Sequence, residues 1–202
     1  MSVQAPVRIA VLGGGNRGSV YANWALAHPD RATVVAVAEP REEWRDAFAK
    51  RHDLPDDRVF RTWQELFDAS VGETRIADAV VVSTQDTDHV RPAIMAAERG
   101  YHLLVEKPMA PNEQDCRRLV TAVREAGVML AVCHVLRYTP YTRLLKQVLD
   151  SGRIGDVMSI QHLEPVGFWH QAHSYVRGNW RKEADSSSML SVSYTHLRAH
   201  ET

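Results

Sequence analysis

The stretch VRIAVLGGGNRG, residues 7–18, determines the fold class. An apolar, β-branched run leads directly into a G-x-G-x-x-G motif. The glycines of the motif are Gly13, Gly15 and Gly18. In a strand-to-helix turn the first permits a tight turn, the second lets backbone amides approach a pyrophosphate, and the third lets helix and strand pack closely. The helix that follows the motif would present amide donors and partial positive charge at its N-terminus, near Asn16 and Arg17, so the stretch predicts a dinucleotide-binding turn.

Beyond this turn, short β-branched runs alternate with amphipathic stretches, which is typical of parallel strands joined by crossover helices. The predicted strands are residues 7–12, 34–38, 79–83, 102–105 and 128–132. The predicted helices are residues 19–27, 41–52, 63–69, 90–99 and 112–126, with Gly100 and Gly127 as C-terminal stops. We therefore predict an α/β fold, a doubly wound Rossmann sheet, and an NAD(P)-binding domain over residues 1–135.

An acidic residue follows the predicted strand 34–38. Glu39 lies 21 residues after Gly18, where a carboxylate would accept hydrogen bonds from both hydroxyls of an adenosine ribose. A solvated loop carboxylate is the alternative. A carboxylate at this point repels a 2′-phosphate and favours NAD, but Arg41 could receive that phosphate, so NADP stays possible.

Composition and charge exclude several classes of protein. The 202 residues carry 24 Lys and Arg against 25 Asp and Glu, and no basic cluster interleaves with aromatic residues, so we expect a small-molecule ligand and no nucleic acid. Without a long apolar run we expect no membrane partner. Cys116 and Cys133 are too few for a disulfide framework and indicate buried thiols in a reducing, cytoplasmic setting, with no metal site.

Two further segments leave predicted strands at the edge where parallel sheets bind ligands. STQDTDH, residues 83–89, follows the strand at 79–83, and Glu106-Lys107-Pro108 follows the strand at 102–105. The Lys107 ammonium could hydrogen-bond a substrate hydroxyl and help move its proton as hydride leaves the same carbon. The alternative for Lys107 is an ordinary surface lysine.

A different organisation begins near residue 137. Residues 138–150 read as a helix and 156–163 as an antiparallel strand, so we predict that 136–191 is the truncated start of an α+β domain with a mainly antiparallel sheet. Residues 165–180 are rich in aromatic, His and Arg side chains, which indicates a pocket wall or the packing beneath one. The substrate candidates in this stretch are Trp169, His170, Tyr175 and Arg177.

Five segments together resemble the Gfo/Idh/MocA family, the glucose-fructose oxidoreductase and inositol dehydrogenase group. They are VRIAVLGGGNRG, the acidic Glu39, VVVSTQDTDH, LLVEKPMA and AVCHVLRYTP. The resemblance implies a Rossmann domain followed by an open antiparallel sheet that makes subunit contacts. It also implies NAD(P)-linked oxidation or reduction of a sugar, cyclitol or related polyol in a homo-oligomeric protein.

The resemblance also carries over individual positions. Lys107 matches the catalytic lysine that contacts nicotinamide ribose and substrate, and a cis peptide before Pro108 would aim it. The other matching cofactor positions are Thr84, His89 and Glu106. Gln85-Asp86 replaces the commoner Pro-Asn, which puts the contacts of that segment in doubt. Arg137 and Tyr138 match a pair near the active site and join the substrate candidates.

The last segment, VSYTHLRAHET at residues 192–202, resembles the translation of a sequencing-library adapter, and we interpret it as a non-native tail; the alternative is a genuine polar tail. The family's Asp and His acid/base segment would follow residue 190, so no residue here takes that role, and His170 and His173 are poor substitutes for it. We expect the chain to be a fragment that binds a dinucleotide weakly if at all and does not turn over.

Three classes of function follow for the parent protein. The first is the NAD(P)-dependent oxidoreductase described above. The second is a glycosidase that uses tightly held NAD for transient oxidation, which would release sugar without accumulating NADH. The third is a non-catalytic dinucleotide-binding regulator, against which the presence of Lys107 argues.

Overall fold

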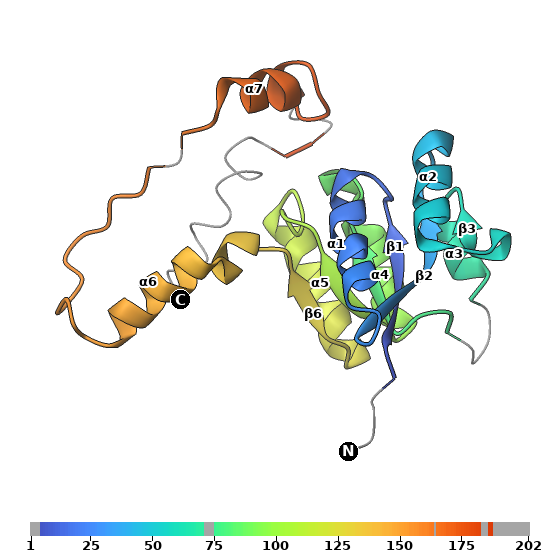
Figure 1. Ribbon diagram of the computed structural model, residues 1–202, viewed down its shortest axis with the longest axis horizontal. Coiled ribbons are helices and arrows are strands. Elements are labelled where there is room, and N and C mark those ends of the chain that lie inside the picture. The colour runs from blue at the N-terminus through green and yellow to red at the C-terminus, as the bar shows by residue number, and fades with distance from the viewer. Residues whose placement is uncertain (1–4, 71–74, 164, 183–185, 188–202) are drawn as a thin grey trace. The chain divides into compact units, whose positions relative to one another are not determined.

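The computed structural model describes residues 5–70, 75–163, 165–182 and 186–187 (Figure 1). Its contacts divide the chain into two compact units, residues 1–133 and 134–202, which we describe separately. The predicted non-native tail at 192–202 lies outside the described residues.

The first unit is built on a parallel sheet of six strands in the order β3-β2-β1-β4-β5-β6. The strands are β1 (Val7–Leu12), β2 (Ala32–Ala38), β3 (Val59–Phe60), β4 (Ala79–Val82), β5 (His102–Val105) and β6 (Leu130–Val132). The chain builds outward from β1 to one edge and then returns to add β4 on the other side of β1. The order therefore reverses between β1 and β4, and a crevice at such a switch point is where open α/β sheets bind ligands.

Helices cover both faces of this sheet. They are α1 (Asn16–Ala27), α2 (Glu42–His52), α3 (Trp63–Asp68), α4 (Val90–Glu98) and α5 (Glu113–Ala126). In β1, Ala10 and Leu12 pack into a core cluster with α3, α4 and α5, whereas Val11 packs with α1 and α2 on the opposite face. This confirms the predicted doubly wound α/β architecture. Of the helices in the described part of the chain, none is long and apolar enough to cross a bilayer.

The element bounds differ from the predictions in a few places. Helix α1 begins at Asn16, directly behind the glycine turn, instead of at Ser19. Strand β2 begins two residues before the predicted start. Strand β3 was not predicted, because a two-residue strand after the 3₁₀ turn Asp56–Arg58 is too short for a periodic pattern.

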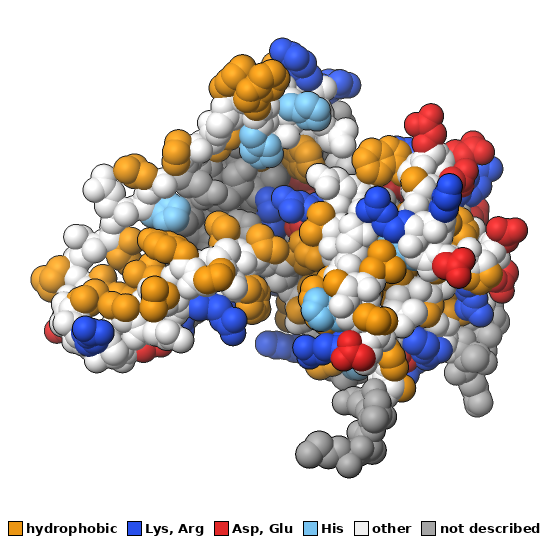
Figure 2. Space-filling model, viewed as in Figure 1, with side chains coloured by type: hydrophobic (Ala, Val, Ile, Leu, Met, Phe, Trp, Pro, Cys, Tyr) orange, Lys and Arg blue, Asp and Glu red, His pale blue; other side chains and the backbone are white. Residues whose placement is uncertain are grey.

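The second unit contains a 3₁₀ turn (Val135–Tyr138), α6 (Pro140–Asp150) and α7 (Phe168–His170), which continues into a π-helical turn at Gln171–Val176. The Thr139 side chain accepts a hydrogen bond from the Thr142 N–H and so caps the start of α6. Apolar side chains lie on the surface of α6 (Figure 2), among them Tyr141, Leu144 and Leu145.

The predicted antiparallel strand at residues 156–163 is wrong. These residues form no strand, and Met158, Ile160 and Leu163 in them are 80–90% exposed. A strand is held by hydrogen bonds to a neighbouring strand, so an alternating pattern cannot form one by itself. No mainly antiparallel sheet is present in the described part of the second unit.

Candidate dinucleotide-binding site

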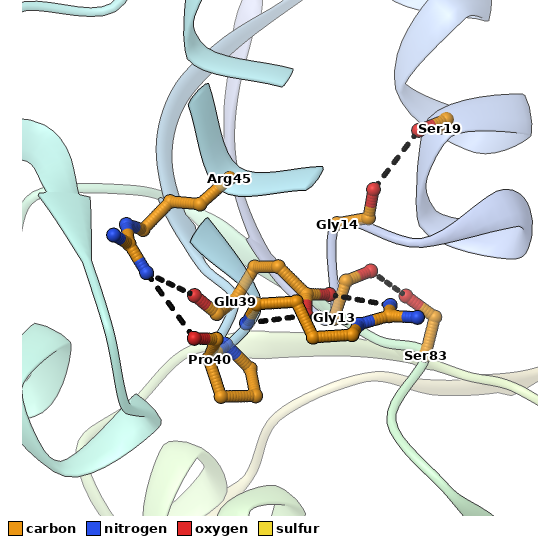
Figure 3. A network of polar contacts seen from close by, with 8 residues as sticks. Gly13, Gly14, Ser19, Glu39, Pro40, Arg45 and Ser83 are labelled. Atoms are coloured by element: carbon orange, nitrogen blue, oxygen red, sulfur yellow. Dashed lines mark hydrogen bonds and ion pairs between the residues drawn. The ribbon is translucent and has the colours of Figure 1, made fainter. Parts of the chain in front are cut away.

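The glycine turn leaves β1 at the switch point of the sheet, and steric contacts explain two of its glycines. Gly13 has φ +90°, and a Cβ atom there would lie 2.5 Å from the Ser83 carbonyl oxygen. A Cβ atom on Gly18 would lie 2.0 Å from the Gly13 carbonyl oxygen. The Ser83 hydroxyl lies 2.9 Å from the same carbonyl oxygen and donates to it, so the end of β4 holds the turn in place (Figure 3).

Gly15 has a different environment. It is the N-cap of α1, and no side chain caps the first amides of this helix. Among the described atoms, the one nearest to a Cβ atom at Gly15 would be Nη2 of Arg41, at 2.9 Å, at the tip of a long side chain. Apart from this flexible group, the backbone around Gly15 is open to a ligand, and the α1 N-terminus points its amide donors and positive dipole there.

Glu39 lies at the end of β2 with only 2% of its surface exposed. Its Oε1 accepts hydrogen bonds from the backbone N–H of Arg41 at 3.1 Å and from Nε of the same residue at 2.7 Å. Its Oε2 accepts from Arg41 Nη2 at 3.0 Å. This hydrogen bonding raises the pKa of the Arg41 guanidinium, which stacks 4.8 Å above the Trp44 ring. Glu39 is therefore a buried carboxylate at the end of β2 whose two oxygens are both held by one arginine.

A second arginine fixes the backbone beside this carboxylate. Arg45 Nη1 donates to the carbonyl oxygens of Glu39 at 3.1 Å and Pro40 at 3.3 Å (Figure 3). Sequence reasoning did not identify Arg45, since an arginine on the first turns of a surface helix is usually solvated. Its contacts hold the turn after β2 in one conformation.

At the end of β5, Glu106 is buried and collects several donors. It accepts from the Tyr21 hydroxyl at 2.7 Å and from the backbone N–H of Lys107 at 2.5 Å, and Arg17 Nε lies 3.7 Å away. Burial, together with hydrogen bonds to Cys133 and Glu106, raises the pKa of Tyr21. Burial raises the pKa of the Cys133 thiol to about 11. The network anchors the backbone from which Lys107 projects.

The Lys107–Pro108 peptide is cis, as the resemblance implied. Beside it, His89 is 1% exposed, with Nδ1 2.9 Å from the Pro108 carbonyl oxygen and Nε2 3.1 Å from that of Thr84. A neutral imidazole has one N–H and donates to one of these carbonyls at a time. Through its ring, His89 links the segment after β4 to the segment that carries Lys107.

The structure places all ten predicted cofactor residues in the segments that follow the carboxyl ends of β1, β2, β4 and β5. These residues are Gly13, Gly15, Asn16, Arg17, Gly18, Glu39, Thr84, His89, Glu106 and Lys107. Tyr21 and Cys133 were not predicted to belong to this region. Tyr21 lies on a helix and Cys133 follows a strand, so no spacing rule relates them to residue 106.

The six predicted substrate residues all belong to the second unit. They are Arg137, Tyr138, Trp169, His170, Tyr175 and Arg177. The rings of His170 and Tyr175 lie 5.5 Å apart, and Tyr175 lies 6.3 Å from Trp180. Trp169 is 76% exposed. Within this unit the structure thus joins some of the aromatic candidates into one ring cluster. Across the described residues, no group of three or more His, Cys, Asp or Glu could hold a metal ion.

Comparisons with known proteins agree with this geometry. Residues 7–134 match the family model for GFO_IDH_MocA, described as an oxidoreductase family with an NAD-binding Rossmann fold. The 2,7-anhydro-N-acetylneuraminate hydratase of Mediterraneibacter gnavus is 37% identical over 152 residues, 75% of this chain and 38% of that protein. The hydratase of the same name from Escherichia coli is 26% identical, over 90% of this chain and 45% of that protein.

Among solved structures, the WlbA dehydrogenase from Bordetella pertussis in complex with NADH and UDP-GlcNAcA is similar. Its TM-score is 0.67 and its identity 29%, over 74% of this chain and 43% of that chain. This chain spans less than half the length of these relatives. The family model covers more than half of this chain, including the glycine turn and the strand ends that form the site. The chain belongs to the Gfo/Idh/MocA oxidoreductase family.

Proposed function

We propose that the protein represented by this chain is an NAD(P)-dependent oxidoreductase that transfers hydride between the nicotinamide and a CH–OH carbon of a sugar, cyclitol or related polyol. One observation carries the proposal. Glu39, a buried carboxylate, lies at the carboxyl end of the sheet together with the glycine turn and with the segment after β5 that carries Lys107, and only a movable side chain lies close to Gly15 in that turn.

The residues at this end of the sheet fit a dinucleotide. The backbone at Gly15 and the first amides of α1 suit the pyrophosphate, with Asn16 and Arg17 beside it. Glu39 suits the two ribose hydroxyls, because each of its two carboxylate oxygens already accepts a hydrogen bond. Thr84, whose carbonyl oxygen contacts the His89 ring, and Glu106 are proposed to line the nicotinamide half.

When bound, the nicotinamide would supply the hydride acceptor or donor. Lys107 is proposed to hydrogen-bond the reacting hydroxyl and to stabilise charge on its oxygen. Its backbone is fixed from two sides, by the Glu106 carboxylate that accepts its N–H and by the His89 ring at Pro108. A fixed backbone limits the positions that the ammonium can reach, which favours one orientation of the substrate.

The substrate contacts are proposed to come from the second unit. Aromatic faces stack on sugar rings, and arginines bind hydroxyl or carboxylate groups. The proposed contacts are Arg137, Tyr138, Trp169, His170, Tyr175 and Arg177. The WlbA relative is bound to a nucleotide sugar, UDP-GlcNAcA, which is consistent with a substrate of this chemical class. A homo-oligomeric assembly remains a prediction.

A second candidate function follows from the hydratases. A relative 37% identical is named for adding water, a reaction with no net oxidation or reduction. The second candidate is therefore a redox-neutral reaction on a sugar, in which the cofactor is oxidised and reduced within one turnover. Absorbance of NADH that accumulates with product would favour the dehydrogenase, whereas product without NADH would favour the redox-neutral reaction.

The dinucleotide site itself can be tested by calorimetric titration of NAD and NADP into the full chain at millimolar ligand. We expect NAD to bind, and Glu39→Ala to weaken that binding at least about tenfold, because the ribose hydroxyls lose a charged acceptor. Glu125→Ala, which removes an exposed carboxylate on α5, is the matched control and should leave binding unchanged. A folded chain that binds neither dinucleotide would overturn the proposal.

A further inference from the structure

We propose that Arg41 selects the cofactor at this site, an inference that rests on the proposed function. Arg41 covers both carboxylate oxygens of Glu39 and must leave them before a ribose can bind there. Once displaced, its guanidinium is available to the 2′-phosphate of NADP. Arg41 thus weakens binding of NAD, strengthens binding of NADP, and brings the two affinities close together.

The contact between Arg41 and Glu39 uses the atoms that a ribose needs. Nε and Nη2 of the guanidinium donate to the two carboxylate oxygens at 2.7 Å and 3.0 Å, in the two-point geometry of a strong ion pair. A ribose diol would donate its two hydroxyls to the same two oxygens. The arginine and the diol therefore compete for one carboxylate.

The same guanidinium also reaches the glycine turn. Its Nη2 lies 2.9 Å from the position that a Cβ atom on Gly15 would take, which is the side from which a pyrophosphate approaches the backbone. One side chain thus covers both the ribose-binding carboxylate and the entrance to the phosphate turn.

Of the two partners, Arg41 is the one that can move. Its side chain is 56% exposed, whereas the Glu39 side chain is 2% exposed and its carbonyl oxygen is held by Arg45. The ring of Trp44, 4.8 Å from the guanidinium, offers a stacking surface beside the site. A displaced Arg41 can stay next to the ribose through this stacking instead of being lost to solvent.

Arg41 therefore has opposite effects on the affinities of the two cofactors. When NAD binds, the Arg41–Glu39 ion pair is replaced by hydrogen bonds from the ribose diol to Glu39. NAD offers the displaced Arg41 no new negatively charged partner. NADP brings a phosphate that Glu39 repels and that the freed guanidinium attracts. A site with Glu39 alone would strongly prefer NAD, whereas a site with both residues should discriminate weakly.

The test uses the full 202-residue chain and two probes that contain only the adenosine half, ADP-ribose and its 2′-phosphorylated form, measured by calorimetry. We expect Arg41→Ala to strengthen binding of ADP-ribose about three- to tenfold and to weaken binding of the 2′-phosphorylated probe at least about fivefold. Arg51→Ala removes the same charge from the far end of α2 and should change either affinity by less than about twofold.

Arg41→Lys separates charge from the two-point contact. Arg41→Lys should strengthen binding of ADP-ribose, as Arg41→Ala does, and should keep most of the affinity for the 2′-phosphorylated probe. If the alanine variant does not fold, the lysine variant still tests the proposal. Weaker binding of both probes by Arg41→Ala would show that Arg41 contacts the pyrophosphate that the probes share, and unchanged binding would show that Arg41 has no role. Either result would overturn this inference and leave the proposed function standing. If the folded wild-type chain binds neither NAD nor NADP, the proposed function fails as well.

Discussion

A Cβ atom at Gly18 would lie 2.0 Å from a backbone carbonyl oxygen, whereas at Gly15 it would meet the end of the flexible Arg41 side chain at 2.9 Å. Backbone cannot move away as a side chain can. At the scale of single residues, the two glycines of one motif therefore serve different purposes. Gly18 is needed for the fold, whereas Gly15 is proposed to keep space for the dinucleotide.

This difference predicts separate effects on stability and on binding. Gly18→Ala should lower the free energy of unfolding by about 1–3 kcal/mol or more, because helix and strand must separate to accept the methyl group. Gly15→Ala should leave stability within about 0.5 kcal/mol and weaken NAD binding, since only a movable side chain is displaced. Urea unfolding and calorimetry measure the two quantities, and equal losses of stability in both variants would contradict the assignment.

The half-buried Tyr21 and the buried Cys133 together predict a loss of stability in alkali. The thiol's pKa rises from 9.0 in the unfolded chain to about 11 in the folded one, and that of Tyr21 is raised too. The thiol's contribution to stability is therefore fully present below about pH 9 and is lost as pH rises from about 9 to 11, because the unfolded chain releases that proton first. Tyr21 adds to the loss above about pH 10 for the same reason.

Each group contributes a slope of at most about 1.4 kcal/mol per pH unit in that range. Urea unfolding at about pH 8 and about pH 10.5 should show a smaller drop for Cys133→Ala than for the wild-type chain. Equal drops in the two proteins would mean that the thiol carries no share of the pH dependence.

At the scale of elements, helix α3 shows how local chemistry places a short helix on the sheet. The Thr62 side chain accepts from the Glu65 N–H at 3.2 Å, and the Glu65 carboxylate accepts from the Thr62 N–H, so the two residues form a capping box. The helix then buries Leu66 and Phe67 against the core. The cap determines where this helix begins, and the buried pair determines which side faces the sheet.

Removing the cap has a defined cost. Thr62→Ala should lower the free energy of unfolding by about 1 kcal/mol, because the amide at Glu65 loses its acceptor. Thr62→Ser keeps the hydroxyl and should cost less than about 0.5 kcal/mol. Urea unfolding of both variants tests this, and a serine variant as unstable as the alanine variant would point to lost packing of the threonine methyl group instead.

At the scale of the whole molecule, the two units differ in how much they bury. Residues 1–133 contain two core clusters, one on each face of the sheet. In the described part of the second unit, no hydrophobic side chain is buried. Burial of apolar surface is the main source of stability, so the second unit should open far more readily than the first.

Limited proteolysis tests this difference. We expect trypsin to cleave first in the second unit, where Arg143, Lys146 and Arg153 are exposed, and to leave residues 1–133 resistant. Mass spectrometry identifies the cut sites. Early cleavage within α2 or α5, which carry exposed basic residues of their own, would contradict the expected order of stability.

Much of the first unit was predictable because its signals are local. The strands at residues 7–12 and 102–105 were predicted with their observed bounds, since nearly continuous apolar runs are typical of strands buried on both faces. Glu39 was predicted from its spacing to the glycine turn, and its burial at the end of β2 agrees with that placement. The strand at 156–163 was wrongly predicted because alternation describes one segment and pairing requires two.

The sequence by itself determined the parallel sheet, the glycine turn and the carboxylate after its second strand, because each depends on residues close together in the chain. Only the tertiary structure decided that Tyr21 and Cys133 meet Glu106, and that His89 links Thr84 to Pro108. It also decided that the Arg41 side chain extends from Glu39 to Gly15. These contacts join strand ends and a helix that come together only when the sheet forms.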